Sequence, residues 1–255
     1  MLIMSNWLDL KKIAESGQCF CWRLIGDGTY EVSSLGRKLA ARQLSPDCIE
    51  ASCDADEWRD IWSGYFDMGS DYAAYEASID PDDEYLLAAA NAAHGLRLLR
   101  QDFWETLVSF IVSQNNNIPR ITGILNRLCV MCDGFPNPTQ LAALSVDELT
   151  KCGVGYRAPY LIAAAIKYID DKPETFLSQY SYNEAKAYLM GYHGIGPKVA
   201  DCVCLYGLGH REAFPRDVWV KRIEREHYDG CFPEFKYPEC AGVLQLFMFW
   251  YERRR

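Results

Sequence analysis

A short glycine-rich turn between two apolar helical patterns places the tightest constraint on how this chain can fold. Residues 189–217 read LMGYHGIGPKVADCVCLYGLGHREAFPRD, so the turn from Gly194 to Gly196 is followed by Lys198 and, further on, by Asp217. Glycines in such a turn expose backbone N–H groups, and the second helix directs the positive end of its dipole to the same place. The pattern therefore predicts a phosphate-binding turn with a lysine beside the bound phosphate.

The rest of the sequence divides into a strand-rich first part and a helical remainder. Residues 20–25 and 29–32 flank a Gly-Asp-Gly hairpin signal, and residues 35–44 and 48–53 predict two more strands. From about residue 84 the apolar positions repeat with a helical period, and N-cap residues are legible at Asp102, Ser145, Ser181 and Asp217. We expect an α+β chain, with an antiparallel sheet domain at residues 1–90 and an all-α domain at 91–255. The two-helix hairpin would span about 186–209.

The net charge of −9 is distributed unevenly along the chain. Residues 1–90 contain 17 acidic and seven basic side chains, a net charge of −10, whereas residues 91–255 contain 18 acidic and 19 basic ones, a net charge of +1. The second part can therefore bind nucleic acid through a few placed cations and backbone amides rather than through a broad basic field. No apolar run is long enough for a membrane span and no export signal is evident, so we expect a soluble intracellular monomer, in cytoplasm and nucleoid or in a nucleus.

Eleven cysteines are present, an odd number. In a chain of this size without an export signal they do not predict a secreted disulfide framework. Cys129 and Cys132 have the spacing of one half of a zinc site, but no second pair follows at the usual distance. Zinc binding is therefore a minor alternative.

Lys198 and Asp217 are the candidates for catalysis. Most lysines are solvated surface groups, but Lys198 precedes an apolar helix face, and partial burial would favour a neutral, nucleophilic amine. The simplest role for Asp217 is a helix N-cap, and a capping carboxylate that faces a cleft can also stabilise positive charge on a sugar ring.

Two polar loops supply candidate contacts to DNA. Residues 114–120 read QNNNIPR, and although they could be only an interhelical turn, Asn115 and Arg120 are side chains that hydrogen-bond base edges. Tyr156 and Arg157 lie at another helix start. Tyr156 is either a core anchor or an aromatic wedge in a duplex, and Arg157 could hold an orphaned base.

Five motifs in this order resemble those of the 8-oxoguanine DNA glycosylases of the helix-hairpin-helix Gly/Pro-Asp superfamily. They are SGQCFCW at 16–22, NNNIPR at 115–120, GVGYRAPY at 153–160, GIGPKVADC at 194–202 and PRDV at 215–218, and AGVLQLFMF at 241–249 fits the same pattern. The resemblance covers nearly the whole chain. It implies a bifunctional DNA glycosylase/AP lyase that flips 8-oxoguanine, opposite cytosine, out of duplex DNA and excises it.

The resemblance also implies the roles of single residues. Lys198 would be the Schiff-base nucleophile, with Asp217 as its acidic partner, and β-elimination would then cleave the strand. The contacts to the flipped base would be a hydrogen bond from N7–H to the carbonyl of Gly17, stacking between Cys202 and Phe249, and hydrogen bonds from Gln245.

The same resemblance implies how the DNA is held. Asn115 would fill the vacated space, Tyr156 would be the wedge, and Arg120 and Arg157 would read the opposite cytosine. The hairpin contacts to DNA would come from Gly194, Gly196 and Val199.

No required cofactor is implied. Some relatives carry a four-cysteine iron–sulfur cluster near the C-terminus, but this chain has only Cys231 and Cys240 there, so we expect no cluster. A structural Na or K ion could bind backbone carbonyls of the 190–195 hairpin, without side-chain ligands. Two alternatives stay open: a glycosylase of the same superfamily for another oxidised base, and a catalytically silent DNA-binding protein.

Overall fold

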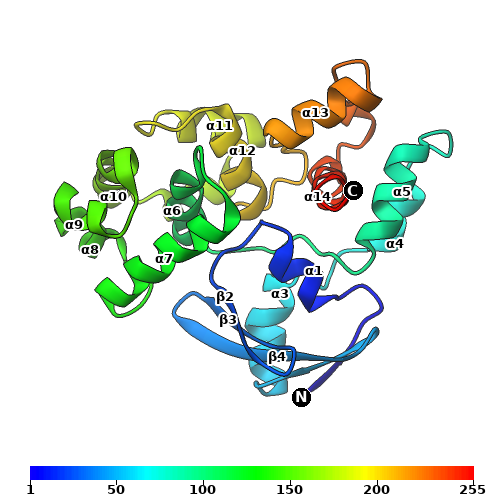
Figure 1. Ribbon diagram of the computed structural model, residues 1–255, viewed down its shortest axis with the longest axis horizontal. Helices are drawn as coiled ribbons and strands as arrows, with labels where there is room; N and C mark the ends of the chain where they lie inside the picture. Colours follow the sequence, from blue (N-terminus) through cyan, green and yellow to red (C-terminus); the bar gives the residue numbers. More distant parts are fainter. The chain divides into compact units, whose positions relative to one another are not determined.

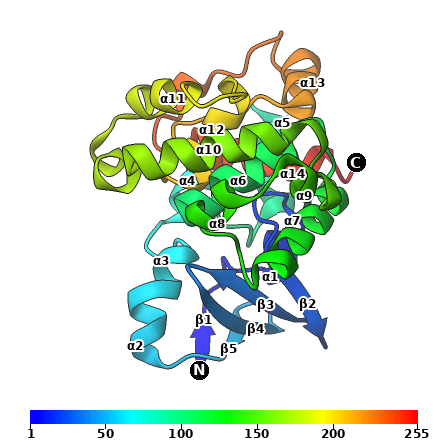
Figure 2. The same cartoon turned by 90° about the vertical axis from the view of Figure 1, so that its left-hand side faces the viewer.

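The computed structural model describes residues 1–255, which form two compact units (Figures 1 and 2). The first unit comprises Met1–Ser33, Lys38–Arg100 and His210–Arg255, and the second comprises Ser34–Arg37 and Gln101–Gly209. The division differs from the predicted boundary between residues 90 and 91, because the last part of the chain returns to the sheet-containing unit. Helix α14 (Ala241–Glu252) packs there against α5 (Glu84–Ala93).

A five-stranded sheet with the order β1-β5-β4-β3-β2 is the centre of the first unit. Its strands are β1 (Leu2–Met4), β2 (Trp22–Gly26), β3 (Thr29–Ser34), β4 (Arg37–Ser45) and β5 (Cys48–Ala51). The pairs β1–β5, β2–β3 and β4–β5 are antiparallel. Gly26, Asp27 and Gly28 all have positive φ, so the hairpin turn forms where it was predicted. Strand β1 was not predicted.

Seven α-helices and a π-helical turn complete the first unit. They are α1 (Leu10–Glu15), α2 (Ala55–Glu57), the turn at Trp58–Trp62, α3 (Ser63–Tyr65), α4 (Tyr72–Ala77), α5, α13 (Val218–His227) and α14, with a 3-10 turn at Glu234–Lys236. Helix α14 is buried along most of its length, and it packs against both α5 and α13. This burial explains its almost continuous apolar sequence.

The second unit contains only helices apart from the Ser34–Arg37 segment. They are α6 (Phe103–Ser113), α7 (Ile118–Cys132), α8 (Pro138–Ala143), α9 (Val146–Lys151), α10 (Ala158–Asp171), α11 (Tyr182–Met190) and α12 (Pro197–Tyr206), with 3-10 turns at Gly155–Arg157, Pro173–Thr175 and Leu177–Gln179. The predicted caps are present at Asp102, Ser145 and Ser181, the last two as capping boxes. The α+β class and the α11–α12 hairpin are thus confirmed. No helix is both long and apolar enough to cross a bilayer.

Candidate active site and DNA-binding elements

The hairpin between α11 and α12 has backbone geometry that only glycine fits. Gly194 has φ of 81°, and a Cβ there would lie 2.5 Å from the ring of Tyr160. Gly196 occupies the N-cap position of α12, and because no side chain caps this helix, its first N–H groups remain open to a phosphate. The side chain of Val199 is buried, which leaves its backbone N–H as the group that can reach DNA.

Lys198 lies in the first turn of α12 and is half-buried. Its Nζ is 5.4 Å from the centroid of the Phe110 ring on α6, and it forms no ion pair. The neighbouring Asp201 is instead paired with Lys186 of α11, at 2.7 Å. The fold therefore fixes α12 through a different lysine and leaves the amine of Lys198 unpaired. Cys202 follows one turn later and is buried.

Three of the predicted DNA contacts lie together in the second unit. Asn115, with φ of 47°, donates from Nδ2 to the hydroxyl of Tyr156 at 3.1 Å, and Tyr156 is half exposed. Arg157 is only 2% exposed, and its guanidinium donates to the carbonyls of Gln114, Val154 and Asn115. Arg157 thus holds the loop together, and its guanidinium is occupied by backbone carbonyls.

Arg120 is placed differently from Arg157. It is exposed in the first turn of α7, which Asn117 caps by accepting a hydrogen bond from the Arg120 N–H at 3.0 Å. Its side chain makes no hydrogen bond or ion pair within the protein. Of the two arginines predicted to read the opposite base, only Arg120 is free to do so without rearrangement.

In the first unit, Asp217 is the N-cap of α13, as predicted. Its Oδ1 accepts hydrogen bonds from the N–H groups of Trp219 and Val220, at 3.0 and 2.9 Å. The preceding Arg216 pairs with Glu224 and Glu234, and although burial lowers the pKa of Arg216, these two hydrogen-bonded pairs raise it above its usual value. The ion pairs hold the segment that leads into the cap.

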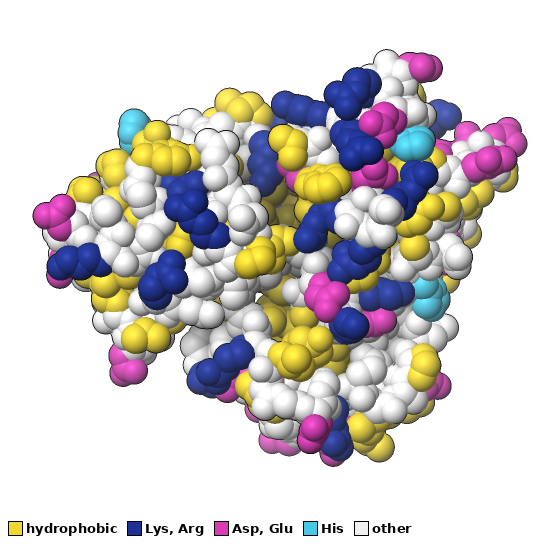
Figure 3. Space-filling view, in the orientation of Figure 1, with side chains coloured by type: hydrophobic (Ala, Val, Ile, Leu, Met, Phe, Trp, Pro, Cys, Tyr) yellow, Lys and Arg dark blue, Asp and Glu magenta, His cyan; other side chains and the backbone are white.

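Basic side chains surround this helix start. Figure 3 shows Lys and Arg side chains gathered over α13, where Lys221, Arg222 and Arg225 are exposed. Lys221 lies one turn beyond Asp217, and a cation there can contact a phosphate of bound DNA, whereas Arg222 and Arg225 are paired with Glu226.

Gln245 and Phe249 lie one turn apart on α14. Gln245 is 4% exposed, and its Oε1 has no hydrogen-bond partner in the protein. Because an unpaired buried acceptor costs about 1–3 kcal/mol, this oxygen is a candidate to receive a donor from a bound base.

Arg253 contacts Phe249 and the end of α1, and the sequence analysis did not predict it as a site residue. Its guanidinium lies 5.1 Å from the centroid of the Phe249 ring, and Nη1 donates to the carbonyl of Glu15 at 3.5 Å. The pKa of Arg253 lies below its usual value, because burial and the neighbouring Arg254 lower it more than the charges of Asp217 and Glu15 raise it. Its spacing of four residues from Phe249 at the end of a helix was the available signal.

Gly17 follows shortly after α1. It has φ of 81° and is partly exposed between two fully buried residues, Ser16 and Gln18. In this left-handed conformation a glycine costs little, whereas a side chain would introduce strain. Its position beside Glu15 places it near the Arg253 contacts described above.

No metal centre is formed by side chains. The structure contains no group of three or more His, Cys, Asp and Glu residues that could hold a metal ion, and all eleven cysteines are free thiols. Burial raises the pKa of the Cys129 thiol to about 11. No third candidate ligand is grouped with Cys129 and Cys132.

A helical hairpin with an unpaired lysine, followed by a helix capped by an aspartate, is the arrangement of the helix-hairpin-helix DNA glycosylases. The model of the 8-oxoguanine DNA glycosylase N-terminal domain matches residues 1–107, and that of the HhH-GPD superfamily of base excision DNA repair proteins matches residues 108–229. The chain belongs to the 8-oxoguanine DNA glycosylase family within this superfamily.

Individual relatives agree with this assignment. A probable N-glycosylase/DNA lyase of Methanothermobacter thermautotrophicus is 32% identical over 68% of this chain and 68% of its own length. An N-glycosylase/DNA lyase of Saccharomyces cerevisiae is 41% identical over 52% of this chain, and the match spans 42% of the yeast protein.

Solved structures are similar over almost the whole chain. MBOgg1 in complex with a low-affinity DNA ligand has a TM-score of 0.91 and 36% identity, covering 98% of this chain and 93% of that one. The Clostridium acetobutylicum 8-oxoguanine glycosylase/lyase, solved with double-stranded DNA containing cytosine opposite 8-oxoG, has a TM-score of 0.90 and 28% identity, with coverage of 98% and 93%.

Proposed function

We propose that this protein excises 8-oxoguanine from duplex DNA and cleaves the strand at the resulting abasic site. The observation that carries the proposal is Lys198, a half-buried amine without an ion pair in the first turn of an uncapped helix. DNA binding alone would need neither this amine nor a carboxylate such as Asp217. The relatives named N-glycosylase/DNA lyase support this reaction class.

The reaction starts with attack by the neutral Nζ of Lys198 on C1′ of the extruded nucleotide. The N-glycosidic bond breaks, its electron pair leaves with the base, and the base is then protonated. The carboxylate of Asp217 stabilises the positive charge that develops on the sugar. Ring opening gives a Schiff base between C1′ and Lys198, and removal of a C2′ proton then expels the 3′ phosphate by β-elimination.

Recognition of the base would precede this step. N7 of 8-oxoguanine carries a hydrogen that the Gly17 carbonyl can accept, whereas N7 of guanine has a lone pair that the carbonyl would repel. The unpaired Oε1 of Gln245 would accept a hydrogen bond from the Watson–Crick edge, and Phe249 and Cys202 would stack on the ring. These contacts would offset the few kcal/mol that base flipping costs.

The DNA contacts follow from the two loops and the hairpin. Arg120 would read the opposite cytosine directly, while Arg157 must exchange its bonds to loop carbonyls before it can contribute. Asn115 and Tyr156 would enter the duplex together, since they are already hydrogen-bonded.

We also propose a monovalent cation at the backbone carbonyls of the 190–195 hairpin. Replacement of Na and K by a bulky organic cation should then weaken binding to duplex DNA.

Borohydride trapping tests the proposal. The substrates are duplexes with one 8-oxoguanine opposite each of the four bases, and the proteins are the wild type, Lys198→Gln and, as a matched control, Lys151→Gln at an exposed lysine of α9. We expect a covalent adduct with the wild type and the control only, strongest opposite cytosine.

Two results would overturn the assignment. An adduct of unchanged yield with Lys198→Gln would exclude this lysine as the nucleophile. No adduct from the folded wild type on any 8-oxoguanine duplex would leave a glycosylase for another lesion, or a silent DNA-binding protein.

A further inference from the structure

Gly17 is a partly exposed residue in an otherwise buried segment. Ser16 and Gln18 on either side are both 0% exposed, and Gly17 has a positive φ. The Gly17 carbonyl lies in the peptide plane shared with Gln18, and φ and ψ of Gly17 relate that plane to the one shared with Ser16. The orientation of the Gly17 carbonyl therefore depends on whatever fixes Ser16 and Gln18.

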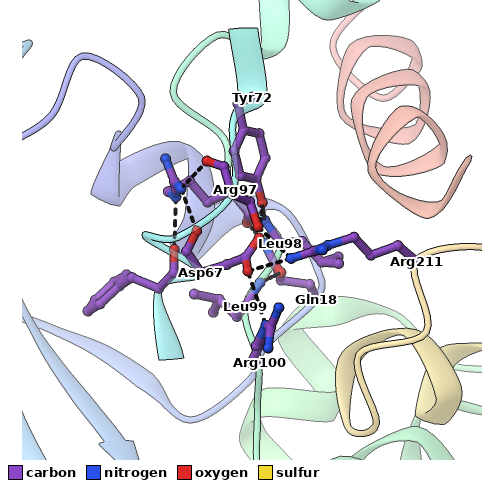
Figure 4. A network of polar contacts seen from close by, with 10 residues as sticks. Gln18, Asp67, Tyr72, Arg97, Leu98, Leu99, Arg100 and Arg211 are labelled. Atoms are coloured by element: carbon purple, nitrogen blue, oxygen red, sulfur yellow. Dashed lines mark hydrogen bonds and ion pairs between the residues drawn. The ribbon is translucent and has the colours of Figure 1, made fainter. Parts of the chain in front are cut away.

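The side-chain amide of Gln18 makes hydrogen bonds at both of its ends. Its Nε2 donates to Ser16 Oγ at 3.0 Å and to the Arg97 carbonyl at 2.9 Å, and its Oε1 accepts from the Leu99 N–H at 2.7 Å. Ser16 Oγ in turn donates to the carbonyl of Ile13 in α1. Gln18 thus clamps the Gly17 turn between the end of α1 and a segment some eighty residues away (Figure 4).

That distant segment is itself rigidly held. Arg97 donates hydrogen bonds to the carbonyls of Trp7, Phe66, Asp67 and Ser70, and its guanidinium lies over the ring of Tyr72. The Tyr72 hydroxyl accepts from the Leu98 N–H at 2.8 Å and donates to the carboxylate of Asp67.

Two further arginines complete the support. Asp67 is 3% exposed, and its carboxylate pairs with Arg100 at 3.0 Å and with Arg211 at 2.7 Å (Figure 4). Trp7 and residues 66–72 therefore bond directly to residues 97–100, the irregular segment to which Gln18 is bound, and Arg211 joins them through Asp67. A side chain so attached transmits the position of residues 97–99 to the Gly17 turn.

We infer that Gln18 is a positioning residue that orients the Gly17 carbonyl for its hydrogen bond to N7–H of 8-oxoguanine. The inference rests on the proposed reading of N7–H by the Gly17 carbonyl. That reading depends on a single hydrogen bond, which weakens steeply once distance or angle departs from the normal range. Without the clamp, the carbonyl of a left-handed glycine can rotate away, and the recognition bond is lost while the catalytic groups remain in place.

Gln18→Met tests this, because it keeps the length of the side chain and removes all three hydrogen bonds. Gln43→Met is the matched control: Gln43 also bridges backbone groups of the first unit, accepting from the Leu10 N–H and donating to the carbonyls of Leu8 and Ser45. Two single-turnover rates are measured, excision of 8-oxoguanine opposite cytosine and β-elimination at a preformed abasic site, which contains no base for Gly17 to read.

Relative to the control, Gln18→Met should excise 8-oxoguanine about tenfold more slowly, the effect of losing about one hydrogen bond, with unchanged β-elimination. Equal excision by the two variants, or a parallel fall of both rates in Gln18→Met, would overturn the inference. Should Gln18→Met fail to fold, Ser16→Ala, which removes the hydroxyl that bonds to Gln18 Nε2, to the Gln18 N–H and to the Ile13 carbonyl, should show the same selective loss. A wild type inactive on both substrates would instead overturn the proposed function.

Discussion

Asp217 caps α13, and the proposed mechanism gives its carboxylate a second role at the sugar, so substitutions at this position test both. Its Oδ1 accepts two N–H groups of the first turn of α13, so its removal leaves both without a partner. Asn caps helices as well as Asp, whereas Ala does not. We therefore expect Asp217→Asn to lose only the interaction of a negative charge with the helix dipole, about 0.3–1 kcal/mol, and Asp217→Ala to lose about 1–2 kcal/mol of unfolding free energy.

The fall in excision rate should be larger than the loss of stability, and it should be the same in the two variants. Removing one preorganised electrostatic group from a transition state typically costs about 3–4 kcal/mol, or a factor of about 10² to 10³ in rate. Both variants lose the charge, so both should show this fall in the single-turnover excision rate, although their stabilities in urea differ.

Binding of each variant to a duplex with an uncleavable abasic analogue provides the control for folding. The reasoning is refuted if Asp217→Asn excises base at the wild-type rate while only Asp217→Ala is slow. In that event the aspartate would act as a cap alone.

Two further predictions concern stability. Tyr72→Phe should lower the free energy of unfolding by about 2 kcal/mol in urea, because the buried Leu98 N–H loses its acceptor; a change below about 0.5 kcal/mol would contradict this. Burial and the charge of Asp102 raise the pKa of Glu105 from 4.5 to about 7. The contribution of Glu105 to the free energy of unfolding is therefore complete below about pH 4.5 and is lost as the pH rises through 7. Glu105→Gln should therefore be more stable than the wild type at pH 8, by about 3 kcal/mol at most, and an advantage at pH 4 instead would refute the sign.

Local signals in the sequence were sufficient for much of the secondary structure. The capping boxes at Ser145 and Ser181 form because their partners, Glu148 and Glu184, lie three residues away in the same turn. The hairpin at Gly26–Gly28 likewise depends only on neighbouring residues. Such elements are legible because the interacting groups are close along the chain.

The grouping of elements into units was not legible in the same way. Residues 210–255 have a helical pattern like that of residues 101–209, yet α14 packs against α5 in the sheet-containing unit. An apolar helix face indicates that it will be buried, but not against which partner. The predicted boundary at residue 90 followed the change in pattern along the chain, whereas the structure follows the contacts.

The sequence likewise does not reveal the partners of buried polar side chains when those partners are distant along the chain. Gln18 and Arg157 both donate hydrogen bonds to backbone carbonyls of distant segments. The carbonyl that Gln18 contacts lies about eighty residues away along the chain, and one that Arg157 contacts lies about forty residues away. Gln245 is the opposite case, because it is equally buried and yet its oxygen has no partner. Residue type and spacing are alike for a polar side chain that supports the fold and for one that awaits a ligand. The structure adds whether each buried donor and acceptor already has a partner: the Arg157 guanidinium is bonded to the loop that carries Asn115, whereas the Oε1 of Gln245 has no partner within the protein.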